Sequence, residues 1–193
     1  IQKVLFPGFL TRFLRRHRDK VVFDFDDAIF TIQDPEANWL QRLQARRRAA
    51  NLPRALSCAG HAIVENDYTR AYADRYCQSV TIITGPIDTE RYHPKSDEGR
   101  SGLLLGWIGS PTTTQYLEVI RPALERLGRH RDGLTLRLIG AGPLGIDAVR
   151  VEHVAWALDT EVEALGVCDI GLMPLPDNPW TEGKGGYKIL QYS

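Results

Sequence analysis

One stretch decides the fold of this chain: Leu103-Leu-Leu-Gly-Trp-Ile-Gly-Ser-Pro-Thr-Thr-Thr114. Its apolar run predicts a buried strand, and the Gly-Ser turn and the threonines predict that a helix follows. Open parallel sheets bind ligands at the carboxyl ends of their strands. Gly109 would let a ligand approach the backbone, and the Ser110 hydroxyl could hydrogen-bond a phosphate oxygen. A capped turn that binds nothing is the alternative.

Short apolar runs alternate with helical patterns along the chain, which predicts βα units around parallel sheets. The expected strands are Lys20–Phe25, His61–Val64, Val80–Thr84, Leu103–Ile108, Leu134–Ile139, Val149–Ala155 and Asp169–Leu172. The expected helices lie near residues 37–50, 68–76, 113–130 and 160–165. Pro122 should kink the third helix or mark a boundary in it. Residues 85–102 lack periodicity and are rich in Gly, Pro, Ser and charge, so we expect a linker there.

Composition narrows the functional classes. The 193 residues carry 24 Lys and Arg against 24 Asp and Glu, so no overall field would recruit nucleic acid. The three cysteines and five histidines show no metal-binding spacing, and we expect no metal site. No apolar run approaches the length of a membrane span, and a cytoplasmic location is the expectation.

The segment Phe23-Asp-Phe-Asp-Asp-Ala28 gathers three carboxylates at the end of an expected strand. Such a cluster can bind a metal, act in acid–base chemistry or cap the next helix. One of the three is a candidate for a catalytic or substrate-facing role. Capping or turn formation explains at least one of the three.

A basic amphipathic pattern lies near the N-terminus. Its apolar and basic members are Phe6, Leu10, Phe13 and Leu14 with Arg12, Arg15, Arg16, Arg18 and Lys20. It fits either contact with anionic lipid at the inner face of a membrane or a solvated helix face.

A second phosphate cradle is predicted by the last stretch, Trp180-Thr-Glu-Gly-Lys-Gly-Gly-Tyr-Lys-Ile-Leu-Gln-Tyr192. Its turn glycines permit close backbone approach, and Lys184 and Lys188 add positive charge. The helical pattern still runs at the last residues with no C-cap signal, so we expect the chain to be a fragment.

Four segments together resemble the retaining glycosyltransferases of family four, which have the GT-B architecture. They are Asp24–Ile29, Val80–Pro94, Gly106–Pro111 and Asp169–Leu175. The resemblance implies an α/β fold of GT-B type with two Rossmann-like parallel-sheet domains, both incomplete here. It assigns residues 1–84 to the N-terminal, acceptor-side domain, residues 85–102 to the interdomain linker and residues 103–193 to the C-terminal, nucleotide-sugar-binding domain.

The resemblance implies transfer of a sugar from a UDP- or GDP-linked donor to a saccharide or lipid-linked acceptor, with retention of configuration and without a cofactor. A role in cell-envelope or polysaccharide biosynthesis follows, and the isolated fragment would be inactive. Two alternatives stay open: a non-catalytic protein of this fold that binds nucleotide sugars or saccharides, and a nucleotide-sugar epimerase.

The resemblance also implies which residues face the donor. Gly109, Ser110 and Lys184 would face the diphosphate, with Lys188 as a second candidate. Gln191 falls where the family has a Glu that contacts the ribose hydroxyls.

The catalytic candidates implied by the resemblance are Asp26 and Glu182. Asp26 lies about where many members carry a functional histidine. The family's other conserved Glu aligns with Gly183, and Glu182 stands one place earlier.

Overall fold

The computed structural model describes residues 8–31, 39–92 and 102–193. The chain divides into two compact units. Unit 1 comprises Ile1–Gly85 and Asp177–Gly185, and unit 2 comprises Pro86–Pro176 and Gly186–Ser193. Residues 177–185 therefore pack with unit 1, although the resemblance counts them with residues 103–193.

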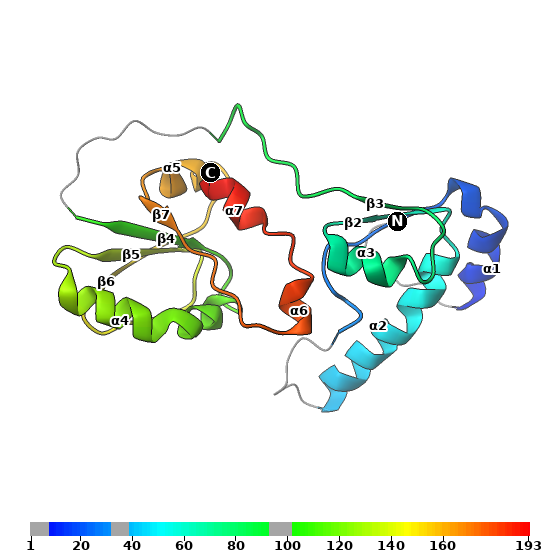
Figure 1. The fold of residues 1–193 in the computed structure, drawn as a ribbon, viewed down its shortest axis with the longest axis horizontal. Coiled ribbons are helices and arrows are strands. Elements are labelled where there is room, and N and C mark those ends of the chain that lie inside the picture. The colour runs from blue at the N-terminus through cyan, green and yellow to red at the C-terminus, as the bar shows by residue number, and fades with distance from the viewer. Residues whose placement is uncertain (1–7, 32–38, 93–101) are drawn as a thin grey trace. The chain divides into compact units, whose positions relative to one another are not determined.

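Unit 1 is built on a parallel sheet in the order β1-β2-β3 (Figure 1). Its strands are β1 (Val22–Asp24), β2 (His61–Val64) and β3 (Val80–Ile82). Its helices are α1 (Gly8–Arg16), η1 (Arg18–Lys20), α2 (Trp39–Ser57), α3 (Asp67–Ala73) and α6 (Pro179–Glu182).

The core of unit 1 forms between the sheet and α2. Phe23 and Phe25 come from β1 and the residue beyond it, and they pack with Leu52 and Leu56 of α2. The helix α2 extends to Ser57 and passes through Pro53, beyond the expected end at residue 50. A proline inside a helix costs about 3 kcal/mol. Complete burial of two leucines contributes about 1.5–3 kcal/mol each, which offsets that cost.

Unit 2 is built on a second parallel sheet, in the order β6-β5-β4-β7. Its strands are β4 (Leu104–Ile108), β5 (Thr135–Ile139), β6 (Arg150–Val154) and β7 (Ile170–Gly171). Its helices are η2 (Thr114–Ile120), α4 (Arg121–His130), α5 (Glu161–Gly166) and α7 (Tyr187–Tyr192). The expected boundary at Pro122 is confirmed, because α4 begins there with proline in its first turn.

Helices cover both faces of the unit 2 sheet. Alternate residues of β4 point to opposite faces, so Trp107 packs toward Leu117 and Leu124 of η2 and α4. Ile108 packs on the other face with Leu165 of α5. Figure 1 shows α4 on one side of this sheet and α5 and α7 on the other. The predicted fold class, α/β with Rossmann-like parallel sheets, is confirmed.

The three cysteines are all reduced, with Cys58 and Cys77 buried and Cys168 partly buried. Among the helices of residues 8–31, 39–92 and 102–193, none is both long and apolar enough to cross a bilayer. The expected linker, residues 85–102, lies partly outside the described residues.

Candidate functional site

The predicted site residues divide between the two units. Asp26, Glu182 and Lys184 belong to unit 1. Gly109, Ser110, Lys188 and Gln191 belong to unit 2. In each unit, site residues follow the carboxyl ends of the strands, as Asp26 follows β1 and Gly109 follows β4. These ends form one edge of each sheet, and the two edges differ in chemistry.

The edge of unit 1 is acidic, with one lysine held in it. Asp26 and Asp27 follow β1, and Glu65 follows β2. The ammonium Nζ of Lys184 lies 2.7 Å from Asp27 Oδ1. The same ammonium lies 4.8 Å from the centre of the Trp180 ring, which orients it further by a cation–π contact. Lys184, predicted to face a diphosphate, is thus engaged by a carboxylate and a ring.

Asn66 holds the Gly-Lys segment against the end of β2. Its Nδ2 donates to the carbonyl oxygens of Glu182, at 3.0 Å, and Lys184, at 3.2 Å. Its Oδ1 accepts from the backbone N–H of Thr69 and so caps α3. One side chain therefore begins a helix and fixes residues 182–184.

Gly183 is buried where no side chain fits. A Cβ at this position would lie 2.4 Å from the Ala28 Cβ and 2.7 Å from the Ala28 nitrogen. A glutamate, which the resemblance aligns with this position, is therefore sterically excluded. Glu182 is exposed instead.

The carboxylates of this edge act on one another. Burial raises the pKa of Glu65, and the negative charges of Asp26 and Asp27 raise it further. The Gly185 N–H and the Lys184 charge lower that pKa in part. Glu182 acts on Tyr68, whose pKa is raised first by burial and then by this carboxylate. The catalytic role of Asp26 and Glu182 stays a prediction.

Within the described part of the chain, no group of three His, Cys, Asp or Glu side chains could hold a metal ion.

The edge of unit 2 is made of glycines and hydroxyls. The turn after β4 contains Gly109 and Ser110, and the turn after the neighbouring β5 contains Gly140 and Gly142. Gly140 has a left-handed backbone, φ 71°, and a Cβ there would lie 2.5 Å from the Gly109 oxygen. Only glycine combines that backbone with that closeness. The two turns therefore touch, as expected for neighbouring parallel strands.

Hydrogen bonds fix the first turn. The Gly109 N–H donates to the Ile139 oxygen at 3.0 Å, and the Ser110 N–H donates to Thr113 Oγ1 at 3.0 Å. The Thr114 hydroxyl accepts from the Gly142 N–H at 2.9 Å and joins the two turns. Ser110 is exposed and its Oγ lies 2.9 Å from Thr112 Oγ1, so hydroxyls line the outside of the turn.

Lys188 lies over the ring of Trp107, the aromatic residue of β4. Its Nζ is 4.5 Å from the centre of the Trp107 ring. A ring face attracts a cation and so helps to hold the ammonium in place. This placement agrees with a phosphate-facing role, which stays a prediction.

Gln191 belongs to a polar cluster with Glu161, Tyr92 and Trp156. Its Nε2 donates to Glu161 Oε1 at 3.0 Å and to the Tyr92 hydroxyl at 3.1 Å. The Tyr92 hydroxyl donates to Glu161 Oε1, and Trp156 Nε1 donates to Glu161 Oε2. Burial, and then the hydrogen bond to Glu161, raise the pKa of Tyr92.

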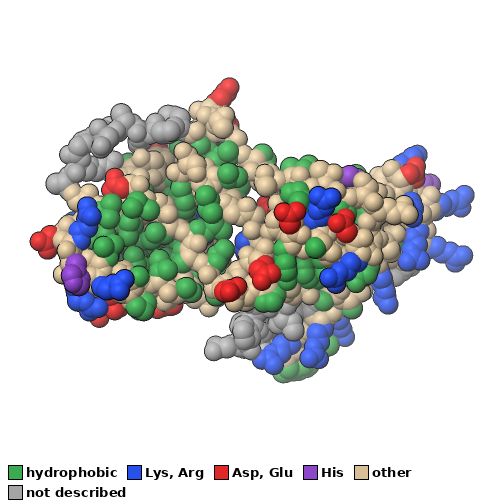
Figure 2. Space-filling view, in the orientation of Figure 1, with side chains coloured by type: hydrophobic (Ala, Val, Ile, Leu, Met, Phe, Trp, Pro, Cys, Tyr) green, Lys and Arg blue, Asp and Glu red, His purple; other side chains and the backbone are tan. Residues whose placement is uncertain are grey.

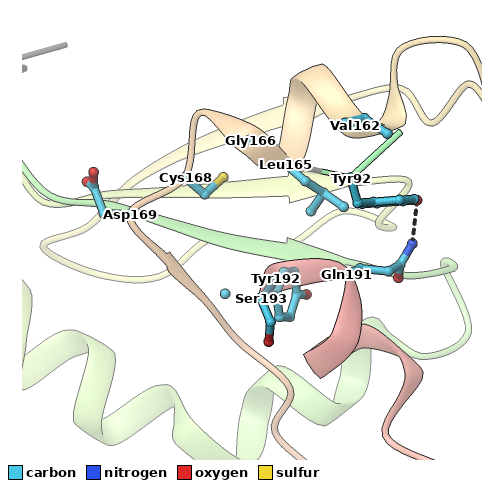
Figure 3. A pocket seen from close by; sticks show the side chains of 10 residues that line it. Tyr92, Val162, Leu165, Gly166, Cys168, Asp169, Gln191, Tyr192 and Ser193 are labelled. Carbon is cyan, nitrogen blue, oxygen red and sulfur yellow. Dashed lines mark hydrogen bonds between the residues drawn. The ribbon is translucent and has the colours of Figure 1, made fainter. Parts of the chain in front are cut away.

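A cavity of about 230 Å³ lies beside this cluster. It runs between α5, β7 and α7 and includes Tyr92, Gln191 and Tyr192 in its lining. Figure 3 shows Tyr92 and Gln191 facing each other at one end of it and Asp169 at the other. Tyr192 packs flat on Gly171, where a Cβ would lie 2.0 Å from its ring.

The basic amphipathic segment forms α1 and, with Arg18 and Lys20, η1, apart from Phe6, which lies outside the described residues. Leu10 and Leu14 are partly buried, whereas Phe13 is 62% exposed. The basic side chains face outward, and Figure 2 shows many Lys and Arg side chains over α1 and α2. Arg15 and Arg18 reach Ser57 and Gln78 at 3.3 and 3.1 Å. Membrane contact stays a prediction.

Sequence reasoning missed Glu65, Asn66 and Glu161. Asn66 could have been found, because Asn three residues before Thr, directly after a strand, is a capping signal. Glu161 gave no such signal, because an acid in the first turn of a helix is ordinary. Only its burial distinguishes it.

Neither the known family models nor the curated proteins contain a match to this chain. Among solved structures the chain is similar to TarM, a glycosyltransferase of GT-B architecture. The likeness has a TM-score of 0.54 at 10% identity, and it covers 78% of this chain and 30% of TarM. At this identity the likeness shows the fold alone.

Proposed function

We propose that the chain is part of a glycosyltransferase that takes a sugar from a nucleotide-diphosphate donor and transfers it with retention of configuration. The observation that carries the proposal is the pair of glycine turns at the carboxyl edge of unit 2. They occur in a fold shared with TarM. Turns without side chains permit the close approach that a diphosphate needs.

In this proposal unit 2 holds the donor. The Ser110 hydroxyl hydrogen-bonds a phosphate oxygen, and Lys188 supplies positive charge beside Trp107. Gln191 receives the ribose. Charge develops on the diphosphate as the sugar leaves, and fixed donors and cations stabilise that charge.

Lys184 has a separate proposed role in donor transfer. Because Asp27 and Trp180 already orient its ammonium, it needs little reorganisation to meet an anion. Asp26 and Glu182 are the proposed catalytic carboxylates. The acceptor is a saccharide or a lipid-linked saccharide.

Nucleotide binding and sugar turnover test the proposal. Isothermal titration with UDP and GDP should show binding of one of them to this chain. The complete protein should hydrolyse or transfer the matching sugar donor, and Lys184→Ala should lower the rate by about 10²–10³-fold. Lys20→Ala, which removes an exposed lysine of η1, is the matched control. A Lys184→Ala rate within a few-fold of wild type removes Lys184 from the reaction.

A second candidate is a nucleotide-sugar-binding protein that no longer catalyses transfer. The packing of Gly183 against Ala28 favours it, because it leaves no space for the family's acidic residue. Binding of UDP or GDP with no donor turnover by the complete protein would select this candidate.

A further inference from the structure

Glu161 is an acidic side chain that the fold keeps almost out of solvent. It is 9% exposed at the start of α5. Its Oε2 accepts from Trp156 Nε1 at 2.5 Å, and its Oε1 accepts from the Tyr92 hydroxyl. Burial of a carboxylate is costly unless its oxygens are satisfied, and here donors reach both of them. Glu161 is thus a fixed acceptor.

The direction of the remaining hydrogen bonds follows. The one Tyr92 hydroxyl proton goes to Glu161, so the Tyr92 oxygen is left as an acceptor. Gln191 therefore meets two acceptors, Glu161 Oε1 at 3.0 Å and the Tyr92 oxygen at 3.1 Å. Only the NH2 end of an amide can face two acceptors, so the network sets the orientation of the Gln191 amide.

The amide oxygen is the end left for a ligand. Each Nε2 proton has a partner, whereas within residues 8–31, 39–92 and 102–193 no hydrogen-bond donor reaches Gln191 Oε1. Gln191 also lines the cavity of about 230 Å³. A ligand that meets this side chain meets a carbonyl oxygen, which accepts and cannot donate.

We propose that Glu161 is a positioning residue that makes Gln191 an acceptor-only contact for one ribose hydroxyl of the nucleotide. The inference rests on the proposed function, because the nucleotide supplies the ribose. A free amide could turn over and receive either a donor or an acceptor. Held by Glu161 and Tyr92, Gln191 selects a ligand hydroxyl and disfavours a deoxy sugar.

Stability measurements test the orientation without any ligand. Gln191→Glu places a second carboxylate about 3 Å from Glu161, and two carboxylates this close cannot both ionise. The folded pair holds a proton that the unfolded chain releases above about pH 4.3. The variant should therefore melt several degrees below wild type at pH 8, and the deficit should shrink toward pH 5.

The exchanged pair, Glu161→Gln with Gln191→Glu, is the matched control. It restores one carboxylate and one amide, so it should recover most of the lost melting temperature at pH 8. A Gln191→Glu protein as stable as wild type at pH 8 overturns the inference. So does an exchanged pair that is no more stable than Gln191→Glu.

Nucleotide titrations test the ribose contact on the wild-type chain. UDP and GDP are each compared with their 2′-deoxy and 3′-deoxy forms. For the nucleotide that binds, one deoxy form should bind about 3–10-fold more weakly, the effect of one lost hydrogen bond. Gln191→Leu should bind the parent nucleotide at that weaker affinity and no longer discriminate, whereas Gln78→Leu, which changes an exposed glutamine of unit 1, should behave as wild type.

Failure of the inference and failure of the proposed function give different results. If the parent nucleotide and both deoxy forms bind wild type equally, the ribose contact is overturned and nucleotide binding stands. If neither UDP nor GDP binds, the proposed function is overturned together with the ribose contact.

Discussion

The carboxyl edges of the two sheets carry side chains of different chemistry. In unit 1 the edge carries Asp26, Asp27 and Glu65, and Lys184 of the Gly-Lys segment forms an ion pair with Asp27. In unit 2 the edge carries glycines and hydroxyls, with charge supplied from one side by Lys188. Both sheets are parallel, so topology fixes where each edge lies but not what it binds. The side chains decide that: the first edge is acidic, with Lys184 paired to Asp27, and the second presents glycine turns and hydroxyls.

The largest expected effect is on residues 182–184, which Asn66 holds in unit 1. Gly183→Glu should destabilise unit 1 by about 3 kcal/mol or more, because the new side chain meets Ala28. The Gly183 backbone, φ −78° and ψ 0°, suits any residue, so the loss would be steric. Urea unfolding with hydrogen exchange measures it and assigns it to a unit.

Glu182→Ala is the control for this change, because Glu182 is exposed and its removal should alter stability by no more than about 0.5 kcal/mol. Loss of protection in unit 2 rather than unit 1 would contradict the assignment of residues 177–185.

The next effect is on the glycine turn of unit 2. Gly109→Ala should cost about 1–3 kcal/mol and weaken nucleotide binding, because its Cβ would lie 2.3 Å from Trp107 Cη2. Gly145→Ala is the matched control, since among the described residues, its two chain neighbours aside, no atom lies within 4 Å of a Cβ there. Equal melting temperatures for the two variants would show that the turn tolerates a side chain, and the contrast between the edges would weaken.

A smaller effect concerns the Tyr192 side chain in unit 2. The Tyr192 hydroxyl donates to the Leu172 oxygen at 3.0 Å and accepts from the Ile108 N–H at 3.3 Å. Tyr192→Phe should therefore cost about 1 kcal/mol at pH 8. Chemical denaturation measures it, with the exposed Tyr187→Phe as control.

The same tyrosine predicts a response to alkaline pH. Burial raises the pKa of Tyr192 from 10.0 to about 12, so the fold favours its neutral form. That stabilisation is complete below pH 10.0 and is lost as pH rises toward about 12. The advantage of wild type over Tyr192→Phe should shrink across this window, and an advantage constant with pH would contradict it.

The smallest effect concerns Glu65 in unit 1, whose raised pKa makes stability depend on pH in the acidic range. Because the pKa of Glu65 is raised from 4.5, its ionised form disfavours the fold, and the cost appears as pH rises above 4.5. Glu65→Gln keeps an oxygen for the Gly185 N–H and should make unit 1 more stable than wild type at pH 7. At pH 4 the two should be equal. Melting curves test this, with exposed Asp19→Asn as control.

Most of the fold followed from local patterns. The expected strands form because apolar runs bounded by turn residues bury well in parallel sheets, and His61–Val64 begins and ends as expected. The end of α2 did not follow, because Pro53 is a local signal, whereas the burial of Leu52 and Leu56 depends on the whole sheet.

The candidate site was less predictable than the fold. The turns at Gly109 and Gly183 are visible as motifs. Their surroundings are not, since Gly183 meets Ala28 and Gln191 meets Glu161 only after distant segments have packed. Pairings between residues far apart in sequence leave no period or spacing to read.

The hydrogen bond from Asn66 to Glu182 in unit 1 also sets an order of events during synthesis. Asn66 must wait for the chain to grow by 116 residues before the carbonyl of Glu182 is made. Folding on the ribosome generally proceeds from the N-terminus. Unit 1 is therefore completed only after residues 86–176 of unit 2 have been translated. Each unit combines two separate stretches of this chain.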